Sequence, residues 1–213
     1  MKKLFLLLLF LCIELNAQVD ISGGMGINLT SNASLNDYIN SINHTSQVST
    51  FNSTIEFFGE VGYNYSKNMI IGLDYTYSIY SYTNDFSDIG KYEISYNQHS
   101  PTIMAYYVIR GNGYKFKFGG GPGLRYVLLK ETLPHSNISS DYSATGFGVL
   151  LKAEGNTAIS KDVFAVIALT LRLDYPGVPK NNGKSLSYNS SSTQDVNLNA
   201  VAGGIRLGIL YTF

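Results

Sequence analysis

The residues with the clearest chemical potential are charged side chains that recur at alternate positions within apolar segments. Acids and bases at such spacing can pair, and two close carboxylates can share a proton as catalytic acid pairs do. Their equal numbers predict mutual neutralisation if they are enclosed together, because a lone buried charge is very costly. Six acids and six bases follow this pattern: Asp20, Glu56, Glu60, Asp74, Glu154 and Asp174, with Lys115, Lys117, Arg125, Lys152, Arg172 and Arg206.

Glu60 and Asp74 are the strongest candidates for an acid pair, because the predicted hairpin register sets them opposite each other on one face. One interpretation is a catalytic dyad. The other is a structural cluster in which Arg206 or Lys152, at similar height, bridges the two carboxylates. A packed interior gives a substrate no route to the pair, so we predict no catalytic residue here.

Three histidines and a glycine run complete the candidates. His44, His99 and His135 share no spacing typical of metal ligands, so no metal site is predicted. The run Gly119–Gly123 lacks the Lys and Ser or Thr of a phosphate-binding loop and opens no helix. The sequence therefore predicts no cofactor.

Eight alternating segments position these side chains. In the last segment, large residues such as Ile205 and Leu207 alternate with small or polar ones and Arg206. Side chains alternate across a strand, so one face is apolar and the other carries the charges. The predicted strands are Val19–Leu29, Thr54–Tyr65, Met69–Tyr82, Tyr92–Arg110, Tyr114–Lys130, Ala144–Ile159, Val163–Tyr175 and Val196–Phe213.

Short and long connections alternate between these strands. The short ones are Ser66–Asn68, Gly111–Gly113 and Ser160–Asp162, and the long polar ones are Thr30–Ser53, Thr83–Lys91, Glu131–Ser143 and Pro176–Asp195. Cross-strand partners must share a face, and a slip of one residue would break every pair. The turns pair Ile109 with Phe116, Tyr107 with Phe118, Tyr65 with Met69, Tyr63 with Ile71 and Ile159 with Val163.

Two kinds of barrel fit this pattern. A soluble lipocalin-like barrel puts its apolar set inside, whereas a membrane barrel turns it outward. Tyrosines at both ends of the apolar face favour the membrane, where an interfacial ring is half apolar and its hydroxyl wet. These are Tyr63, Tyr65, Tyr114 and Tyr211 near the short turns, and Tyr75, Tyr77, Tyr126 and Tyr175 near the long loops. We predict an all-β, eight-stranded antiparallel up-and-down transmembrane β-barrel with its lumen filled by side chains.

Composition sets the domain organisation. Lys+Arg and Asp+Glu both number 15, so no basic surface is available for nucleic acid. Lys2 and Lys3, the apolar run Leu4–Ile13 and a small residue at Ala17 indicate a signal peptide over residues 1–18. The single cysteine, Cys12, lies within it, so the barrel domain, residues 19–213, has no thiol chemistry.

The expected signal peptide, strands, alternating connections, aromatic girdles and carboxyl-terminal Phe213 resemble the small OmpA/OmpX-like barrels of the porin family. The resemblance implies a monomer in the bacterial outer membrane with both termini periplasmic, surrounded by lipid and lipopolysaccharide. It also implies that the lumen charges act as structure or as a gate, and that Phe213 is read transiently by the barrel assembly machinery. No peptidoglycan-binding domain is expected after Phe213.

The leading function is a structural or surface-interaction role carried by four long extracellular loops. The first alternative is an enzyme acting on outer-membrane lipid. Pro101 and Pro122 predict a weak seam between neighbouring strands, either a bulge or kink or a lateral opening such as that associated with lipid A palmitoyltransferases. His44-Thr45-Ser46 has the spacing of lipid A deacylases but lies in a loop. A narrow channel is the second alternative.

Overall fold

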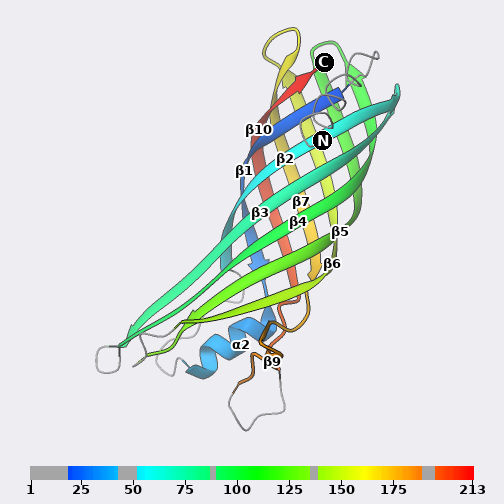
Figure 1. Cartoon of the computed structure of the whole chain (residues 1–213). Coiled ribbons are helices and arrows are strands. Elements are labelled where there is room, and N and C mark those ends of the chain that lie inside the picture. Colours follow the sequence, from blue (N-terminus) through cyan, green and yellow to red (C-terminus); the bar gives the residue numbers. More distant parts are fainter. Residues whose placement is uncertain (1–18, 43–51, 87–89, 135–138, 189–194) are drawn as a thin grey trace, which may run out of the picture.

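The computed structural model describes residues 19–42, 52–86, 90–134, 139–188 and 195–213, and its eight long strands form one antiparallel ring (Figure 1). The expected signal peptide lies outside these residues. Within them, no helix is long and apolar enough to cross a membrane. The ring strands are β1 (Val19–Ser31), β2 (Asn52–Ser66), β3 (Met69–Phe86), β4 (Gly90–Gly111), β5 (Tyr114–Thr132), β6 (Ser139–Ala158), β7 (Val163–Tyr175) and β10 (Ala200–Thr212).

The ring closes by pairing of its first and last strands. β1 lies antiparallel to β10 from Asp20 opposite Thr212 to Ser31 opposite Val201. The strands from β1 to β7 each pair with the next strand in the chain. β7 then pairs with β10, because the short strands β8 and β9 do not belong to the ring. A closed ring leaves no strand edge unpaired, which is the condition for a sheet to cross hydrocarbon. The predicted fold class is confirmed.

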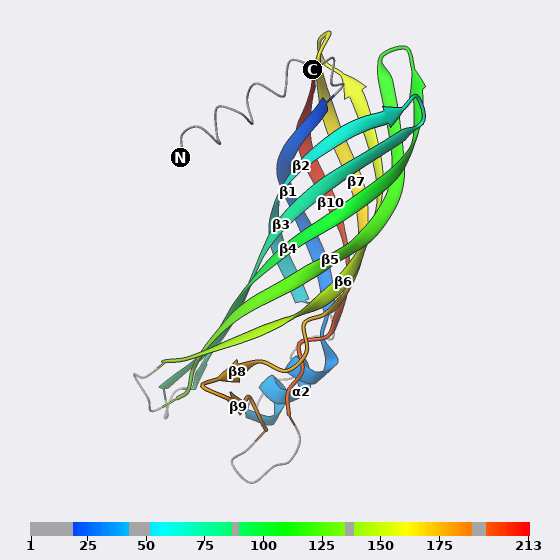
Figure 2. The ribbon, with the colours of Figure 1, turned by 45° about the vertical axis from the view of Figure 1, so that its right-hand side comes forward.

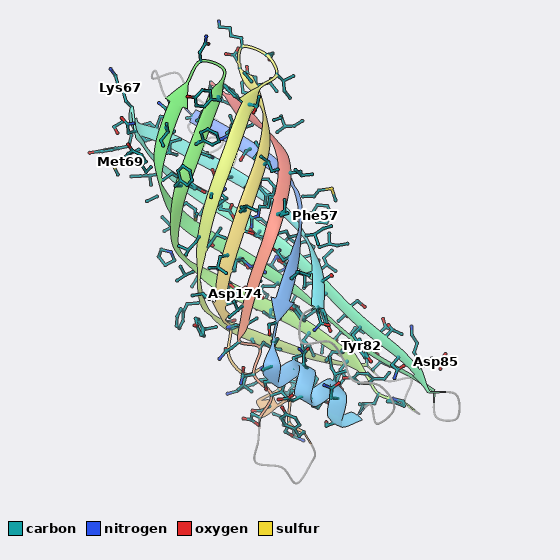
Figure 3. The ribbon with its side chains drawn as sticks, turned by 180° about the vertical axis from the view of Figure 1, so that it is seen from behind. Phe57, Lys67, Met69, Tyr82, Asp85 and Asp174 are labelled. Atoms are coloured by element: carbon teal, nitrogen blue, oxygen red, sulfur yellow. The ribbon has the colours of Figure 1, made fainter. Side chains whose placement is uncertain are left out.

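The apolar face is turned outward. Leu207 is 58 % exposed and Ile205 53 %, whereas Arg206 between them is fully buried. Phe57 likewise projects away from the barrel in Figure 3. This sidedness contradicts the lipocalin-like alternative. All eight predicted girdle tyrosines lie on the outer face, Tyr77 being half-buried and the others exposed.

The three short turns gather at one end of the barrel, the turn end, together with the carboxyl terminus (Figure 1). The pairs Tyr63–Ile71, Ile109–Phe116 and Tyr107–Phe118 are as predicted, and the Ile159 N–H donates to the Val163 carbonyl at 2.8 Å. The predicted pair of Tyr65 with Met69 is wrong. Ser66 faces Met69, because a register shift between Asn64 and Ser66 leaves Tyr65 outside the ladder.

The opposite end, the loop end, is extended on one side of the ring. β3 to β6 run well beyond the other strands and lean outward as two hairpins (Figure 2). Two predicted loops were therefore too long, because β3 reaches Phe86, β4 starts at Gly90, β5 reaches Thr132 and β6 starts at Ser139. Figure 3 shows Lys67 and Met69 at one end of β3 and Asp85 at the other.

The first long connection contains a helix that sequence analysis did not predict, α2 (Ala33–Ile42). The Asn32 side-chain oxygen accepts the Leu35 N–H at 2.9 Å, which caps the amino terminus of the helix. Leu35, Tyr38 and Ile39 form a buried apolar stripe at i, i+3 and i+4. The last long connection contains a small hairpin, β8 (Lys180–Asn181) and β9 (Lys184–Ser185), and β10 begins at Ala200 rather than Val196.

The fourth and fifth strands meet along an irregular seam. Their ladder passes from His99–Tyr126 to Thr102–Gly123 and then to Ala105–Gly120, leaving out the positions of Pro101 and Pro122. The two prolines are diagonal neighbours in this register, as predicted. Proline cannot donate to the ladder, which accounts for the interruption.

Candidate functional site: the charged lumen and its lid

The structure places all twelve predicted charged side chains in the lumen, each 6 % exposed or less. Alternation along every strand turns them inward while their apolar neighbours lie on the outer face. They come from β1, β2, β3, β5, β6, β7 and β10. Residues up to 186 positions apart in the chain therefore share one enclosed space, as Asp20 and Arg206 do.

At the centre, Glu60 and Asp74 face each other across β2 and β3. Lys152 forms an ion pair with Glu60 and lies 3.5 Å from Asp74. Lys117 lies 2.8 Å from Glu60 and 2.7 Å from Glu154. The carboxylates are thus held apart by cations, which is the structural interpretation rather than a proton-sharing dyad.

Two arginines continue the network toward the loop end. The Arg206 Nε atom lies 2.5 Å from Glu56, and its Nη1 atom lies 2.9 Å from Asp74. The Arg172 Nη1 atom lies 3.0 Å from the other Glu56 oxygen, and its Nε atom lies 3.2 Å from Asp174. Asp174 in turn pairs with Arg125.

These contacts join into one network of five acids and five bases. It runs from Lys117 through Glu60, Glu154, Lys152, Asp74, Arg206, Glu56, Arg172 and Asp174 to Arg125. The remaining two charges, Asp20 and Lys115, pair separately at 2.8 Å near the turn end. The network is neutral when all its groups are ionised, so burial leaves no uncompensated charge.

Several neutral partners escaped sequence analysis. The Tyr106 hydroxyl donates to Glu60, and the Asn28 amide donates to Glu56 at 2.5 Å. Gln98 donates to Asp174 at 3.0 Å, and Arg206 donates to Thr76 at 2.8 Å. The alternation of inward and outward positions along each strand would by itself place these side chains inside. These neutral residues carry a weaker signal than the charges, because an uncharged polar side chain is also common on an exposed strand face.

The loop end of the lumen is covered by a lid, which we define as α2 packed on the inner face of the extended strands. Its buried apolar residues Leu35, Tyr38 and Ile39 meet Ile94 and Leu129, and residues Leu186, Val196 and Leu198 of the last connection join the same core. Figure 2 shows α2 and the β8–β9 hairpin beneath the barrel, beside the extension. The lid closes this end with apolar packing.

One buried acid connects the lid to the extension. The apolar outward residues of the strands form a belt around the barrel, the apolar band, which ends at Leu128 on β5. Glu131 lies on the loop side of Leu128 and is therefore outside this band. Its Oε1 atom accepts the Tyr38 hydroxyl at 2.6 Å and the Tyr92 hydroxyl at 3.1 Å. Burial raises the pKa of Glu131, and burial together with the Glu131 charge raises the pKa of Tyr38, which stays protonated as a donor.

Of the three histidines, the structure describes only His99. His99 faces outward on β4, and His44 and His135 lie outside the described residues. Within the part of the chain that the structure describes, no three His, Cys, Asp or Glu residues are placed to hold a metal ion.

No protein-family model and no curated protein matches the sequence. Solved structures match over 92 % of this chain. They include Neisserial surface protein A, with 15 % identity, a TM-score of 0.53 and 97 % of its chain covered. Ail of Yersinia pestis, in complex with the heparin analogue sucrose octasulfate, has 14 % identity, a TM-score of 0.54 and 99 % covered. A major outer membrane protein of Thermus thermophilus has 13 % identity, a TM-score of 0.55 and 99 % covered. The protein has the eight-stranded fold of small outer-membrane β-barrels.

Proposed function

We propose that the protein is a closed outer-membrane barrel that acts as a structural and surface-interaction element through the extension and lid at its loop end. The observation that carries this proposal is the filled lumen. A neutral network of buried ion pairs crosses it, and α2 packs over its loop end. Such an interior offers neither a wide diffusion path nor access for a substrate.

The proposal places the turn end and both termini in the periplasm and the lid at the cell surface. Cysteine labelling tests this orientation cleanly, because the only natural cysteine is Cys12, within the expected signal peptide. A membrane-impermeant maleimide added to intact cells should label Lys184→Cys, on β9, and leave Lys67→Cys, at a short turn, unlabelled. Labelling of Lys67→Cys alone would reverse the orientation.

Closure of the lumen is tested by recording from the full folded chain in planar bilayers. We expect no stepwise conductance from the unmodified protein. Regular single-channel openings would instead support the narrow channel that the sequence left open.

A lipid-modifying enzyme is the other alternative, and it predicts a change in the lipid itself. Mass spectra of lipid A from cells with and without the protein should be identical under our proposal. Loss or gain of an acyl chain that depends on the protein would establish the enzymatic alternative. The acid pair Glu60 and Asp74 does not favour it, because Lys152 and Arg206 occupy the two carboxylates.

The type of surface partner is limited by charge. Ail was crystallised with a heparin analogue. Outside the apolar band at the loop end, four described lysines, Lys91, Lys130, Lys180 and Lys184, stand among the acids Asp37, Asp85, Glu93, Glu131, Asp141 and Asp195. This mixture gives no continuous basic surface along which a sulfated glycan chain could lie. We therefore propose lipid and lipopolysaccharide, rather than a sulfated glycan, as the neighbours of this end.

Assembly is the second interaction that we propose. Phe213 is 61 % exposed, and its ring lies 4.6 Å from that of Tyr211 in an edge-to-face contact. An exposed terminal aromatic pair is available for transient recognition by the barrel assembly machinery. Phe213→Ala should lower the amount of folded protein in the membrane of living cells, whereas refolding of the purified variant into detergent should be unchanged.

A further inference from the structure

The outer face of β4 changes character at His99. On the turn side of this residue, the outward positions are Pro101, Ile103 and Ala105, which lie in the apolar band. On the loop side they are Asn97, Ser95 and Glu93. His99 therefore stands at the boundary between hydrocarbon and headgroup, where an amphipathic ring is favoured.

Three tyrosines surround this histidine. The Tyr77 ring lies 5.0 Å from the His99 ring, and those of Tyr126 and Tyr75 lie at 6.1 and 6.2 Å. The Tyr75 hydroxyl is 2.7 Å from His99 Nδ1. Donation by that hydroxyl leaves the hydrogen on Nε2 in the neutral ring, and the protonated ring also carries Nε2–H. The imidazole would then present a donor at Nε2 in either state.

A hollow of about 410 Å³ lies on the loop side of this cluster. Asn97 and its register partner Leu128 line it, one outward position beyond His99 and Tyr126, a distance of about 7 Å along a strand. Ser95, Lys130, Asp141 and Tyr142 supply the other polar groups of the lining. Lys130 and Asp141 are both described and are register partners, yet they form no ion pair with each other, whereas Lys91 pairs with Glu93 at 3.1 Å. The Lys130 ammonium is therefore available to a ligand.

We propose that His99 and this hollow bind the headgroup of a phosphate-bearing glycolipid from the leaflet at the loop end. His99 Nε2–H and the Lys130 ammonium donate to phosphate oxygens, while Asn97, Ser95 and Asp141 serve sugar hydroxyls. Asp141 is the reason for a glycolipid, because a carboxylate repels a bare phosphate but accepts from a hydroxyl. The acyl chains lie on the apolar wall on the turn side of His99, over Ile103 and Leu124, both of which are exposed.

The inference rests on the proposed function, because only the proposed orientation turns this site toward the outer leaflet, where lipopolysaccharide supplies such a headgroup. The cysteine labelling described above separates the two failures. If Lys184→Cys is labelled from outside but no headgroup binds, this inference alone is wrong. If the orientation is reversed, both are wrong.

Native mass spectrometry of the full folded chain in detergent tests the site, with bisphosphorylated lipid A as the probe. We expect a one-to-one complex that is about tenfold weaker in His99→Phe and in Lys130→Gln, because each removes one charge-assisted or polar donor. Lipid A stripped of its phosphates and phosphatidylglycerol should both bind more weakly than the probe.

Two matched variants act as controls. Lys184→Gln removes an exposed lysine of the same end outside the hollow, and Tyr175→Phe removes an interfacial hydroxyl on β7. Both should retain the affinity of the unmodified chain. Equal retention of phosphorylated and dephosphorylated lipid, equal binding of phosphatidylglycerol, or unchanged binding by His99→Phe and Lys130→Gln would each overturn the proposal. Circular dichroism confirms that every variant is folded.

Discussion

Lys152 holds together the most acidic part of the lumen. Its ammonium pairs with Glu60 and lies 3.2 Å from Glu154 and 3.5 Å from Asp74. Lys152→Met would leave these carboxylates one cation short in a closed space. We expect the free energy of unfolding to fall by about 3–5 kcal/mol, measured by urea titration in phosphocholine vesicles.

Two further variants, one at an exposed turn and one in the network, serve as comparisons for this prediction. Lys161→Met removes an exposed turn lysine and should change the free energy of unfolding by less than about 0.5 kcal/mol. Adding Glu154→Gln to Lys152→Met restores the charge balance and should recover part of the loss. An unfolding midpoint of Lys152→Met equal to that of the unmodified chain would show that the network is neutral in energy.

The lid is attached through Glu131, and its docking should depend on pH. Burial raises the pKa of Glu131, so the docked state binds this proton more tightly than the undocked state does. The free energy of docking therefore becomes less favourable as the pH rises from the ordinary glutamate pKa of 4.5 through the raised pKa of Glu131. Above the raised pKa, this free energy no longer changes with pH. Hydrogen exchange of the α2 amides, corrected for the intrinsic pH effect, should speed up over this window.

Glu131→Gln is the matched variant for that measurement. It keeps an acceptor for the Tyr38 hydroxyl, which donates at 2.6 Å, but removes the titrating proton. The pH dependence of α2 protection should disappear. If the variant retains the same dependence, another group controls the lid.

The glycines of β5 permit its close approach to β4. A Cβ atom at Gly121 would collide with the Ile103 carbonyl oxygen and lie 3.2 Å from the Met104 Cα. Gly121→Ala should lower the free energy of unfolding by about 1–3 kcal/mol in the urea titration. At Gly59 a Cβ would meet nothing within 4 Å, so Gly59→Ala should be neutral or slightly stabilising. Equal effects would refute the steric account.

The same seam should open more readily than the rest of the ring. The β4–β5 ladder is interrupted around Pro101 and Pro122, whereas β1–β10 pairs continuously over its whole register. Amides flanking the two prolines, such as those of Thr102 and Gly123, should exchange faster than those of Ile27 and Ile205. Uniform protection of both strand pairs would remove the seam from consideration.

Sequence alternation predicted the strands wherever the outward positions are almost all apolar. The prediction failed for the parts of the strands whose outward positions are polar. Beyond the apolar band, the outward residues Thr83 and Asp85 have loop composition although they continue β3. The helix α2 has only ten residues and an apolar stripe of Leu35, Tyr38 and Ile39, which is stable only through packing on the extension.

For the candidate site, the sequence predicts which side chains point into the lumen but not which of them pair. Parity placed Glu56 and Arg172 in one lumen, but their 3.0 Å pairing depends on how the strands are staggered around the ring. That stagger follows from closure of β1 on β10 and has no local signal in either strand. A local irregularity is equally hard to predict. At Tyr65, one register shift removed the residue from its predicted pair with Met69.

The whole molecule depends on closure between its first and last strands, β1 and β10, which are separated by most of the chain. Ile27 on β1 lies opposite Ile205 on β10, and Leu169 on β7 lies opposite Ile205 on the other side. Ile27 and Leu169 are thus two strand spacings apart, about 9–10 Å. A disulfide needs Cα atoms within about 7 Å, so cross-linking discriminates between these two distances.

The variant Ile27→Cys/Ile205→Cys should form a disulfide in the folded barrel, and Ile27→Cys/Leu169→Cys should not. All three positions face outward, so neither pair disturbs the lumen. Closing so long a loop should raise the free energy of unfolding by about 4–5 kcal/mol, and reduction should abolish the gain. Non-reducing electrophoresis after oxidation, followed by urea titration, measures both effects. Cross-linking of the Ile27→Cys/Leu169→Cys pair instead would mean that β10 does not lie between β1 and β7, and that the ring does not close through β10.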